Sequence, residues 1–371
     1  TETLMKQIGG RMDGISLHYY TVGDWNNKGS ATDFNTEDYY WTLGKCLEIE
    51  DVVKKHIAIM DKYDPKKNIA LMVDEWGTWW DVEPGTIPGH LFQQNTMRDA
   101  FVAALTLHVF HKYTDRVKMT NIAQIVNVLQ SMILTDTKGT GHMVLTPTYH
   151  VFNMYKDFQE ATYLPMDVKC DSMDVRGDDH AKDGRKIPLV STSAAKKADG
   201  TIVVALANVS LDKAQQVEFN LDGAAAPKTV TGQILSCNKV SDYNDFAHPD
   251  VVKPAVFKDA KVKKNTALHK ENLAGSTATW SSEMARGVTG MVKDWLRRQI
   301  DEEQSLTLPA SNLVPGCRVR LQIRQGLQAD LKTVEITLPP DFSVGRPVRL
   351  RGLGKRVGPW QGDLYLTLYT E

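Results

Sequence analysis

The strongest constraint on the fold is a short apolar run, Ile69–Val73, that ends at two adjacent carboxylates, Asp74 and Glu75. An apolar run of this length with a polar boundary predicts a buried strand. In α/β barrels the catalytic groups follow the C-terminal ends of the strands. The two carboxylates therefore predict either a site at the end of a barrel strand or a strand end whose Asp caps the next turn.

Three tryptophans follow the carboxylates, at Trp76, Trp79 and Trp80. Flat aromatic rings offer large apolar faces, and these can stack on the C–H faces of a sugar. A neighbouring carboxylate can attack or protonate close to the anomeric carbon. The combination favours a sugar site. The alternative is that the indoles belong to the core.

Five separated stretches share one resemblance. They are Met12–Tyr20, Asp74–Trp79, Asn121–Val128, Thr146–Phe152 and Pro249–Pro254. In this order they resemble motifs of the family 51 α-L-arabinofuranosidases, over residues 1–265. The resemblance implies an α/β part followed by an all-β part: a partial (β/α)8 barrel and then a β-sandwich.

The resemblance also implies roles for individual residues. The Glu of the family's Asp-Glu-Trp motif is the nucleophile of a retaining hydrolysis, and it corresponds to Glu75. Tyr20 would hydrogen-bond Glu75 and His18 would line the same pocket, although either could instead be an ordinary barrel residue. Trp79 would form the sugar platform, and Gln124 would reach a sugar hydroxyl. The implied substrates are terminal arabinofuranosyl residues of arabinoxylan- or arabinan-type polysaccharides, and no metal or organic cofactor is needed.

The general acid/base of the family lies in an Asn-Glu dipeptide on an earlier strand. No Asn-Glu dipeptide occurs in this sequence. The chain opens with what resembles the sixth barrel strand, whereas a complete barrel takes about 250 residues. We therefore expect about three of the barrel strands here, and little hydrolysis by the chain as given.

The periodicity changes along the chain. Amphipathic helices at Glu37–Tyr63 and Phe92–Tyr113 alternate with short strands. Strand-like runs at Thr201–Asn208, Gln215–Leu221 and Thr229–Leu235 follow, a pattern typical of a β-sandwich. The predicted domains are 1–165 for the C-terminal part of a barrel, 166–268 for a sandwich, 269–280 for a linker and 281–371 for a helix with a small β-rich domain.

The type of basic residue changes near residue 270. Residues 1–280 hold 26 Lys and 5 Arg, whereas residues 281–371 hold 3 Lys and 10 Arg. Lys is favoured by AT-rich codons and Arg by GC-rich codons. The change indicates a fusion of segments from two coding backgrounds; the alternative is a domain whose surface prefers Arg. The small, polar stretch Glu271–Thr277 predicts the linker between them.

The C-terminal part is expected to begin with an amphipathic helix, Ser281–Gln304. Three later stretches, Val334–Pro340, Gly345–Gly354 and Gln361–Leu366, resemble the C-terminal substrate-binding domain of J-domain (DnaJ-type) chaperones. The resemblance implies binding of unfolded polypeptide by strand addition at a sheet edge. The alternative function is therefore a non-catalytic fusion with a chaperone module. The expected strands are Ser305–Pro309, Arg318–Ile323, Thr333–Leu338, Pro347–Leu350 and Asp363–Tyr369.

Charge and composition argue against several partners. The chain has 44 Lys and Arg against 45 Asp and Glu, and a net charge near zero disfavours nucleic acid as a general partner. No apolar stretch is long enough for a membrane span. The four cysteines are isolated, without the paired spacing of a zinc or redox site. His108 and His111 have no third ligand in register, so we expect them on a helix surface rather than at a metal.

Overall fold

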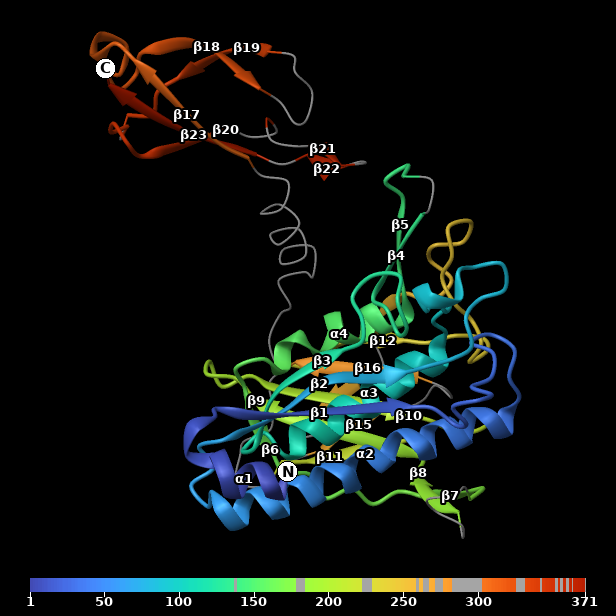
Figure 1. Cartoon of the computed structure of the whole chain (residues 1–371). Helices are drawn as coiled ribbons and strands as arrows, with labels where there is room; N and C mark the ends of the chain where they lie inside the picture. Colours follow the sequence, from blue (N-terminus) through green and yellow to red (C-terminus); the bar gives the residue numbers. More distant parts are fainter. Residues whose placement is uncertain are drawn as a thin grey trace. The chain divides into compact units, whose positions relative to one another are not determined.

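The structure of the 371-residue chain is a computed structural model. Two compact units make up the chain, one of Thr1–Gly139 with Met143–Ala285 and one that holds Arg286–Glu371 (Figure 1). The structure describes residues 1–136, 139–177, 184–221, 229–257, 260–262, 267–270, 276–281, 302–324, 331–340, 342–350, 353, 356–357, 360–361 and 363–370.

A three-stranded parallel sheet begins the larger unit. Its strands are β1 (Gly14–Thr21), β2 (Ala70–Thr78) and β3 (Val117–Ile122), in the order β1-β2-β3. Parallel neighbours need a crossover, usually a helix. Helix α2 (Thr36–Tyr63) connects β1 to β2, and α3 (Met97–Lys112) connects β2 to β3 (Figure 1). Because the strands run the same way, their C-terminal ends meet at one edge of the sheet.

Both crossover helices begin at a capping box. The side chain of Asn35 accepts a hydrogen bond from the N–H of Asp38, and the side chain of Asp38 accepts one from the N–H of Asn35. Thr96 and Asp99 make the same exchange at the start of α3. Helix α2 confirms the first predicted helix, whereas α3 begins after the predicted Phe92, because the cap at Thr96 fixes the first turn.

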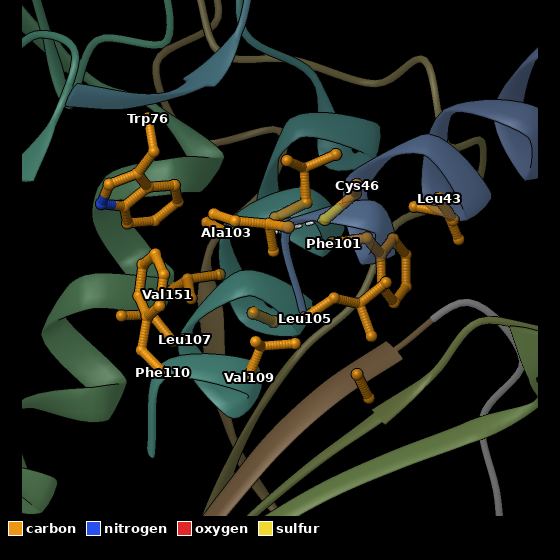
Figure 2. Close-up of a cluster of buried hydrophobic side chains, with 14 of the residues drawn as sticks. Leu43, Cys46, Trp76, Phe101, Ala103, Leu105, Leu107, Val109, Phe110 and Val151 are labelled. Carbon is orange, nitrogen blue, oxygen red and sulfur yellow. Dashed lines mark hydrogen bonds between the residues drawn. The ribbon is translucent and has the colours of Figure 1, made fainter. Parts of the chain in front are cut away.

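The core of this unit lies around α3. Every residue of α3 from Met97 to Phe110 is buried, and a helix that is covered on all sides belongs to the interior. Trp76 of β2 meets Phe110 edge-on at 5.5 Å between ring centroids. It also stacks at 5.8 Å on Phe152 of α4 (Pro147–Tyr155). Figure 2 shows Trp76 gathered with Phe110 and Val151 in this core.

Antiparallel strands make up most of the rest of the unit. A six-stranded sheet has the order β13-β12-β16-β10-β9-β6, and a three-stranded sheet has the order β11-β15-β14. The three strands predicted between residues 201 and 235 are confirmed as β10, β11 and β12. The strands are β6 (Thr162–Leu164), β9 (Val190–Lys196), β10 (Ile202–Asn208), β11 (Val217–Asn220), β12 (Thr231–Leu235), β13 (Pro254–Phe257), β14 (Ala260–Val262), β15 (Ala267–Lys270) and β16 (Ser276–Ser281).

The linker predicted at residues 269–280 is wrong where β16 lies. This strand pairs with β10 on one side, from Val203↔Ser281 to Asn208↔Ser276, and with β12 on the other. Its small, polar residues suggested a loop, but Thr277 and Thr279 are β-branched and fit a strand. The place of a strand inside a sheet depends on backbone pairing with distant segments, and local composition does not show that pairing.

Shorter elements complete the larger unit. Two hairpins and a short N-terminal helix accompany the main elements, with single 3-10 turns at residues 9–11, 88–90 and 156–158. Among the helices of the described ranges, none combines the length and apolar character needed to cross a membrane. The remaining elements are α1 (Glu2–Ile8), β4 (Ile133–Thr135), β5 (Met143–Leu145), β7 (Ser172–Val175) and β8 (Arg185–Pro188).

The smaller unit has a core of its own. Its buried apolar residues include Leu321, Leu338 and Leu366. The sheet β17-β23-β20 and the pair β18-β19 contribute residues to this core, and β21 and β22 form a separate short pair. The strands are β17 (Glu302–Leu308), β18 (Arg318–Arg324), β19 (Leu331–Thr337), β20 (Pro347–Leu350), β21 (Arg356–Val357), β22 (Trp360–Gln361) and β23 (Leu364–Thr370).

The helix predicted at Ser281–Gln304 falls mostly outside the described residues. Both of its ends are strand instead, because Ser281 closes β16 and residues 302–304 open β17. Strand β17 pairs in parallel with β23, beginning at Glu302↔Leu364. Pairing with a distant strand overrides the helical periodicity at this end of the predicted helix.

Candidate active site

The C-terminal ends of β1 and β2 bring two polar side chains into direct contact. His18 is the register partner of Glu75, and Tyr20 is the partner of Gly77. The phenol of Tyr20 donates a hydrogen bond of 2.7 Å to Oε2 of Glu75. The hydrogen bond expected from the sequence is therefore present, and it links two residues that lie far apart along the chain.

In the pair of Tyr20 and Glu75, the phenol is the donor and the carboxylate is the acceptor. Burial, followed by the hydrogen bond to Glu75, raises the pKa of Tyr20 above its ordinary value. The phenol therefore keeps its proton in the neutral range and remains a donor. His18 Nδ1 lies 3.4 Å from the same oxygen, Oε2 of Glu75. In the part of the chain that the structure describes, Oε1 of Glu75 has no hydrogen bond.

Aromatic rings continue outward from Tyr20. Its ring meets that of Trp79 edge-on at 4.9 Å between centroids, and Trp79 meets Trp25 at 5.4 Å. Trp25 is 56% exposed. By contrast, Trp76 and Trp80 are buried. The core alternative therefore holds for Trp76 and Trp80, whereas Trp79 lies beside Tyr20.

Sequence reasoning missed Trp25. It follows β1 in the loop directly after Tyr20, and the resemblance assigned no role to that loop. The sequence feature that pointed to Trp25 was its closeness along the chain to the stretch Met12–Tyr20. An exposed tryptophan so close to a strand end that carries site residues could have been included on that ground alone.

A buried polar network fixes the chain on both sides of Trp79. The N–H of Thr78 donates to Oε1 of Gln130 at 2.8 Å, and its Oγ1 donates to Oδ1 of Asp99 at 2.6 Å. Nε1 of Trp80 donates to the same Asp99 oxygen at 2.9 Å. The N–H of Trp80 donates to Gln93 at 2.8 Å. Leaving a buried donor without its partner is costly, so this network holds Trp79 in place.

Gln124 lies just after the end of β3, the strand next to β2 in the sheet. The N–H of Ala123 donates to the carbonyl of Trp76 at 2.9 Å, which ties this end of β3 to β2. The Gln124 side chain is exposed. The described residues show no hydrogen bond between this side chain and Glu75, Tyr20 or His18. The structure thus brings the predicted residues His18, Tyr20 and Glu75 together with Trp79. It places Gln124 at the same edge of the sheet.

Two further carboxylates lie in the loop after Trp79, and both bind backbone. Oδ2 of Asp81 accepts from the N–H of Gly29 at 3.1 Å. Oε1 of Glu83 accepts from the N–H of Gln94 at 2.9 Å. These contacts hold the loop rather than Glu75. A retaining glycosidase needs a second carboxyl about 5–5.5 Å from the nucleophile.

The surface position predicted for the two histidines of α3 is wrong for His108, which is buried, while His111 is half-buried. His108 is 1% exposed, with Nδ1 2.8 Å from Oγ of Ser191 and Nε2 2.7 Å from the phenol of Tyr155. His111 Nδ1 lies 2.9 Å from Oγ of Ser193. Strand β9 covers this face of α3, and periodicity does not show that cover. Within the described ranges, no group of three or more His, Cys, Asp or Glu could hold a metal ion.

Comparison with known proteins agrees with this arrangement. A family model for the alpha-L-arabinofuranosidase C-terminal domain matches residues 74–271, which include Glu75 and Trp79. The chain belongs to this family. Its sequence is 61% identical over 267 residues to an intracellular exo-alpha-L-arabinofuranosidase of Bacteroides ovatus, covering 72% of this chain and 50% of that relative.

Solved structures show the same relationship. A GH51 arabinofuranosidase from Xanthomonas axonopodis pv. citri superposes with a TM-score of 0.70 and 42% identity, covering 76% of this chain and 55% of that one. An alpha-L-arabinofuranosidase from Thermotoga maritima, in complex with arabinose, shares the fold with a TM-score of 0.59 at 21% identity and covers 76% of this chain and 55% of its own. The chain therefore spans about half the length of these relatives.

Proposed function

We propose that this chain carries the nucleophile side of a retaining exo-α-L-arabinofuranosidase site. The observation that carries the proposal is the 2.7 Å hydrogen bond from Tyr20 to Oε2 of Glu75, with Trp79 beside it. The 61% identity to an enzyme with this name supports the proposal. The substrates would be terminal arabinofuranosyl residues of arabinoxylan- or arabinan-type polysaccharides.

The proposed reaction has two displacements. Oε1 of Glu75 attacks the anomeric carbon, the bond to the leaving oxygen breaks, and a second carboxylic acid gives that oxygen its proton. Water then attacks the glycosyl ester with the second carboxylate as its base, and Glu75 is released. The phenol of Tyr20, which donates to Oε2, holds the carboxylate and disperses its charge. No metal or organic cofactor takes part in either step.

The other site residues receive roles from their positions. Trp79 would lie under the sugar ring, and its contact with Tyr20 places it next to Glu75. Trp25 would extend this apolar wall. Gln124, exposed at the end of the neighbouring strand, would bind a sugar hydroxyl. His18 would line the pocket at the Glu75 carboxylate.

The parallel sheet would be the C-terminal part of a (β/α)8 barrel. Its three parallel strands alternate with crossover helices, and the candidate residues lie at their C-terminal ends, as in barrel enzymes. The antiparallel strands up to β16 would form the β-sandwich that follows the barrel. The boundary of the first domain would then remain near residue 165, while the second domain would extend to residue 281.

A second proposal concerns the smaller unit. It has its own apolar core, and β17 and β20 are the edge strands of its three-stranded sheet. An edge strand can accept an extended peptide as an added strand. Binding of unfolded polypeptide is therefore the proposed role of residues 302–370, and fluorescence anisotropy with a labelled unfolded peptide measures it directly. Anisotropy that stays flat at saturating protein would rule this role out.

The enzymatic proposal is tested best in a chimera. The part of the Bacteroides ovatus relative that precedes the matched region is joined to residues 1–281 of this chain, where identity of 61% favours correct packing. The chimera should hydrolyse p-nitrophenyl α-L-arabinofuranoside. Glu75→Gln should abolish this activity, and the matched control Glu83→Gln should retain it. Equal activity in the two variants would refute the role of Glu75.

The chain alone provides a second arm of the test. Loss of a general acid typically reduces the rate by a factor of about 10²–10⁴. We therefore expect the chain without the added segment to be slower than the chimera by at least that factor. Comparable rates would show that a carboxylate within this chain supplies the proton.

A further inference from the structure

The loop between β1 and α2 carries Trp25, whose indole is 56% exposed and meets Trp79 edge-on at 5.4 Å between centroids. The N–H of Asn26 donates to Oδ1 of Asp24 at 2.8 Å. Nζ of Lys28 donates to the carbonyl of Trp25 at 2.8 Å. Both hydrogen bonds stay inside the loop, so they shape it without fixing it to the rest of the unit. The place of Trp25 therefore depends on contacts further along the loop.

The second half of the loop is tied to neighbouring segments. Gly29 donates its N–H to Oδ2 of Asp81 at 3.1 Å, and its carbonyl accepts from the N–H of Asp81 at 2.9 Å. Nη2 of Arg98 donates to the next two carbonyls, those of Ser30 at 3.0 Å and Ala31 at 3.1 Å. The hydrogen bond to Ala31 is buried, and a buried acceptor that loses its donor is costly. Arg98 thus fixes this part of the loop to α3.

Arg98 lies in the first turn of α3 and is 2% exposed. Its Cζ lies 3.6 Å from the ring centroid of Phe34 and 3.7 Å from that of Trp80, so the guanidinium contacts two aromatic rings. A planar guanidinium stacks well on such rings, whereas a lysine ammonium is a compact charge without a flat face. Phe34 belongs to the end of the same loop. Arg98 therefore contacts the loop twice, through two carbonyls and through a ring.

The other partners of Arg98 belong to the interior. Trp80 is buried, and its Nε1 donates to Oδ1 of Asp99 at 2.9 Å. The N–H of Arg98 donates to the carbonyl of Val240 at 3.0 Å. Nε of Arg98 is buried and has no hydrogen-bond partner in the described part of the chain. A buried charge is costly unless it is compensated, so Arg98 requires the loop as the loop requires Arg98.

We propose that Arg98 is a positioning residue of the candidate site, which holds the loop after β1 so that Trp25 stays beside Trp79 as the outer part of the sugar wall. Arg98 is buried and does not touch the sugar. It acts on Trp25 through the carbonyls of Ser30 and Ala31. The effect on sugar binding rests on the proposed function, whereas the place of Trp25 is a property of the chain without substrate.

The first test follows Trp25 in the chain itself, labelled with 5-fluorotryptophan. Each of the eight tryptophans gives a ¹⁹F signal, and Trp25→Phe assigns the signal of Trp25. In Arg98→Lys this signal should shift toward that of free 5-fluorotryptophan and become narrower, because the ring loses its contact with Trp79. Arg116→Lys is the matched control, since Arg116 is also buried in this unit but binds Asp64, and it should leave the signal unchanged. An unchanged signal in Arg98→Lys, or an equal shift in both variants, would overturn the proposal.

Phe34→Leu decides the matter where Arg98→Lys fails to fold, which would be seen as loss of the spread of all ¹⁹F signals. Phe34 is only partly buried, and leucine keeps an apolar side chain while it removes the ring beside the guanidinium. The Trp25 signal should shift in the same direction as in a folded Arg98→Lys. A Trp25 signal at the wild-type position in Phe34→Leu would overturn the proposal.

Kinetics of the chimera connect Arg98 to sugar binding. Trp25→Ala and Arg98→Lys should each raise KM about threefold with little change in kcat, because both take the same ring away from the site. The double variant should have the KM of Trp25→Ala alone, since residues that act through one another are not additive. Full addition of the two effects, or an unchanged KM in Trp25→Ala, would overturn the proposal. Because the ¹⁹F spectrum needs no substrate, the expected Trp25 shift in a chain whose chimera has no turnover would count against the role of Glu75 alone.

Discussion

The phenol of Tyr20 donates a 2.7 Å hydrogen bond to Oε2 of Glu75, from the end of one parallel strand to the end of its neighbour. This contact orients the carboxylate through Oε2, while Oε1 has no hydrogen bond among the described residues. It also joins two of the five sequence stretches that carry the family resemblance, Met12–Tyr20 and Asp74–Trp79. The proposed chemistry depends on this relationship more than on any other in the molecule.

Removal of the Tyr20 donor should slow catalysis without unfolding the chain. A hydrogen bond to a charged group contributes roughly 1.5–3 kcal/mol, so Tyr20→Phe should lower kcat/KM of the chimera by roughly 10- to 100-fold. Tyr19→Phe is the matched control, because Tyr19 is on the same strand but donates to the carbonyl of Lys45. Kinetics with an aryl arabinofuranoside measure both. Equal losses in the two variants would contradict the role of Tyr20.

Trp79 should contribute to sugar binding rather than to folding. Trp79→Ala removes the ring beside Tyr20, and aromatic contacts contribute about 0.5–1.5 kcal/mol beyond buried area. We expect KM of the chimera to rise by about 3- to 10-fold, with a smaller change in melting temperature than for the buried Trp80→Ala. Steady-state kinetics and thermal melts check both halves. An unchanged KM would exclude Trp79 as the platform.

Gly77 is required by its backbone. Its φ is +139°, and an added Cβ would lie 3.1 Å from Oε1 of Gln130, the atom that accepts from the N–H of Thr78. A strained backbone of this kind costs about 1–3 kcal/mol. Gly77→Ala should therefore lower the melting temperature by several degrees. Gly89→Ala meets no atom within 4 Å and is the control. Equal melting temperatures for the two variants would refute this reading of Gly77.

Buried histidines should make the larger unit sensitive to acid. Burial lowers the pKa of His111 and of His150 to about 4, from 6.5. The folded state thus favours the neutral rings, so this stability is complete above pH 6.5 and is lost as the pH falls toward 4. The fall in melting temperature across this window should be smaller in His111→Gln than in the wild type. His248→Gln, at a side chain that is 72% exposed, should leave it unchanged.

The sequence predicted the local parts of this architecture well. Helix α2 was predicted to within a residue at its start, since its apolar face repeats clearly. Strand β2 was predicted only to Val73, yet it continues to Thr78. The prediction stopped early because the apolar run ends where Asp74 and Glu75 follow Val73. The Tyr20–Glu75 contact was predicted from the family resemblance. Periodicity alone could not have shown that residues on two separate strands meet.

The features that the sequence did not predict depend on distant partners. Strand β16 is small and polar, and only its pairing with β10 and β12 makes it part of a sheet. His108 is buried because β9 covers its helix. The ring nitrogen of Trp80 can be buried because Asp99 accepts its hydrogen bond. The local sequence pattern does not predict these contacts.

The most direct test is covalent trapping of the nucleophile. The chimera is incubated with an arabinofuranoside that carries fluorine at C2 and a good leaving group, which slows hydrolysis of the glycosyl-enzyme. Peptide mapping by mass spectrometry then locates the label. The account predicts a single sugar on the peptide that contains Glu75, and no label in the Glu75→Gln variant. A label on another carboxylate, or equal labelling of Glu75→Gln, would contradict it.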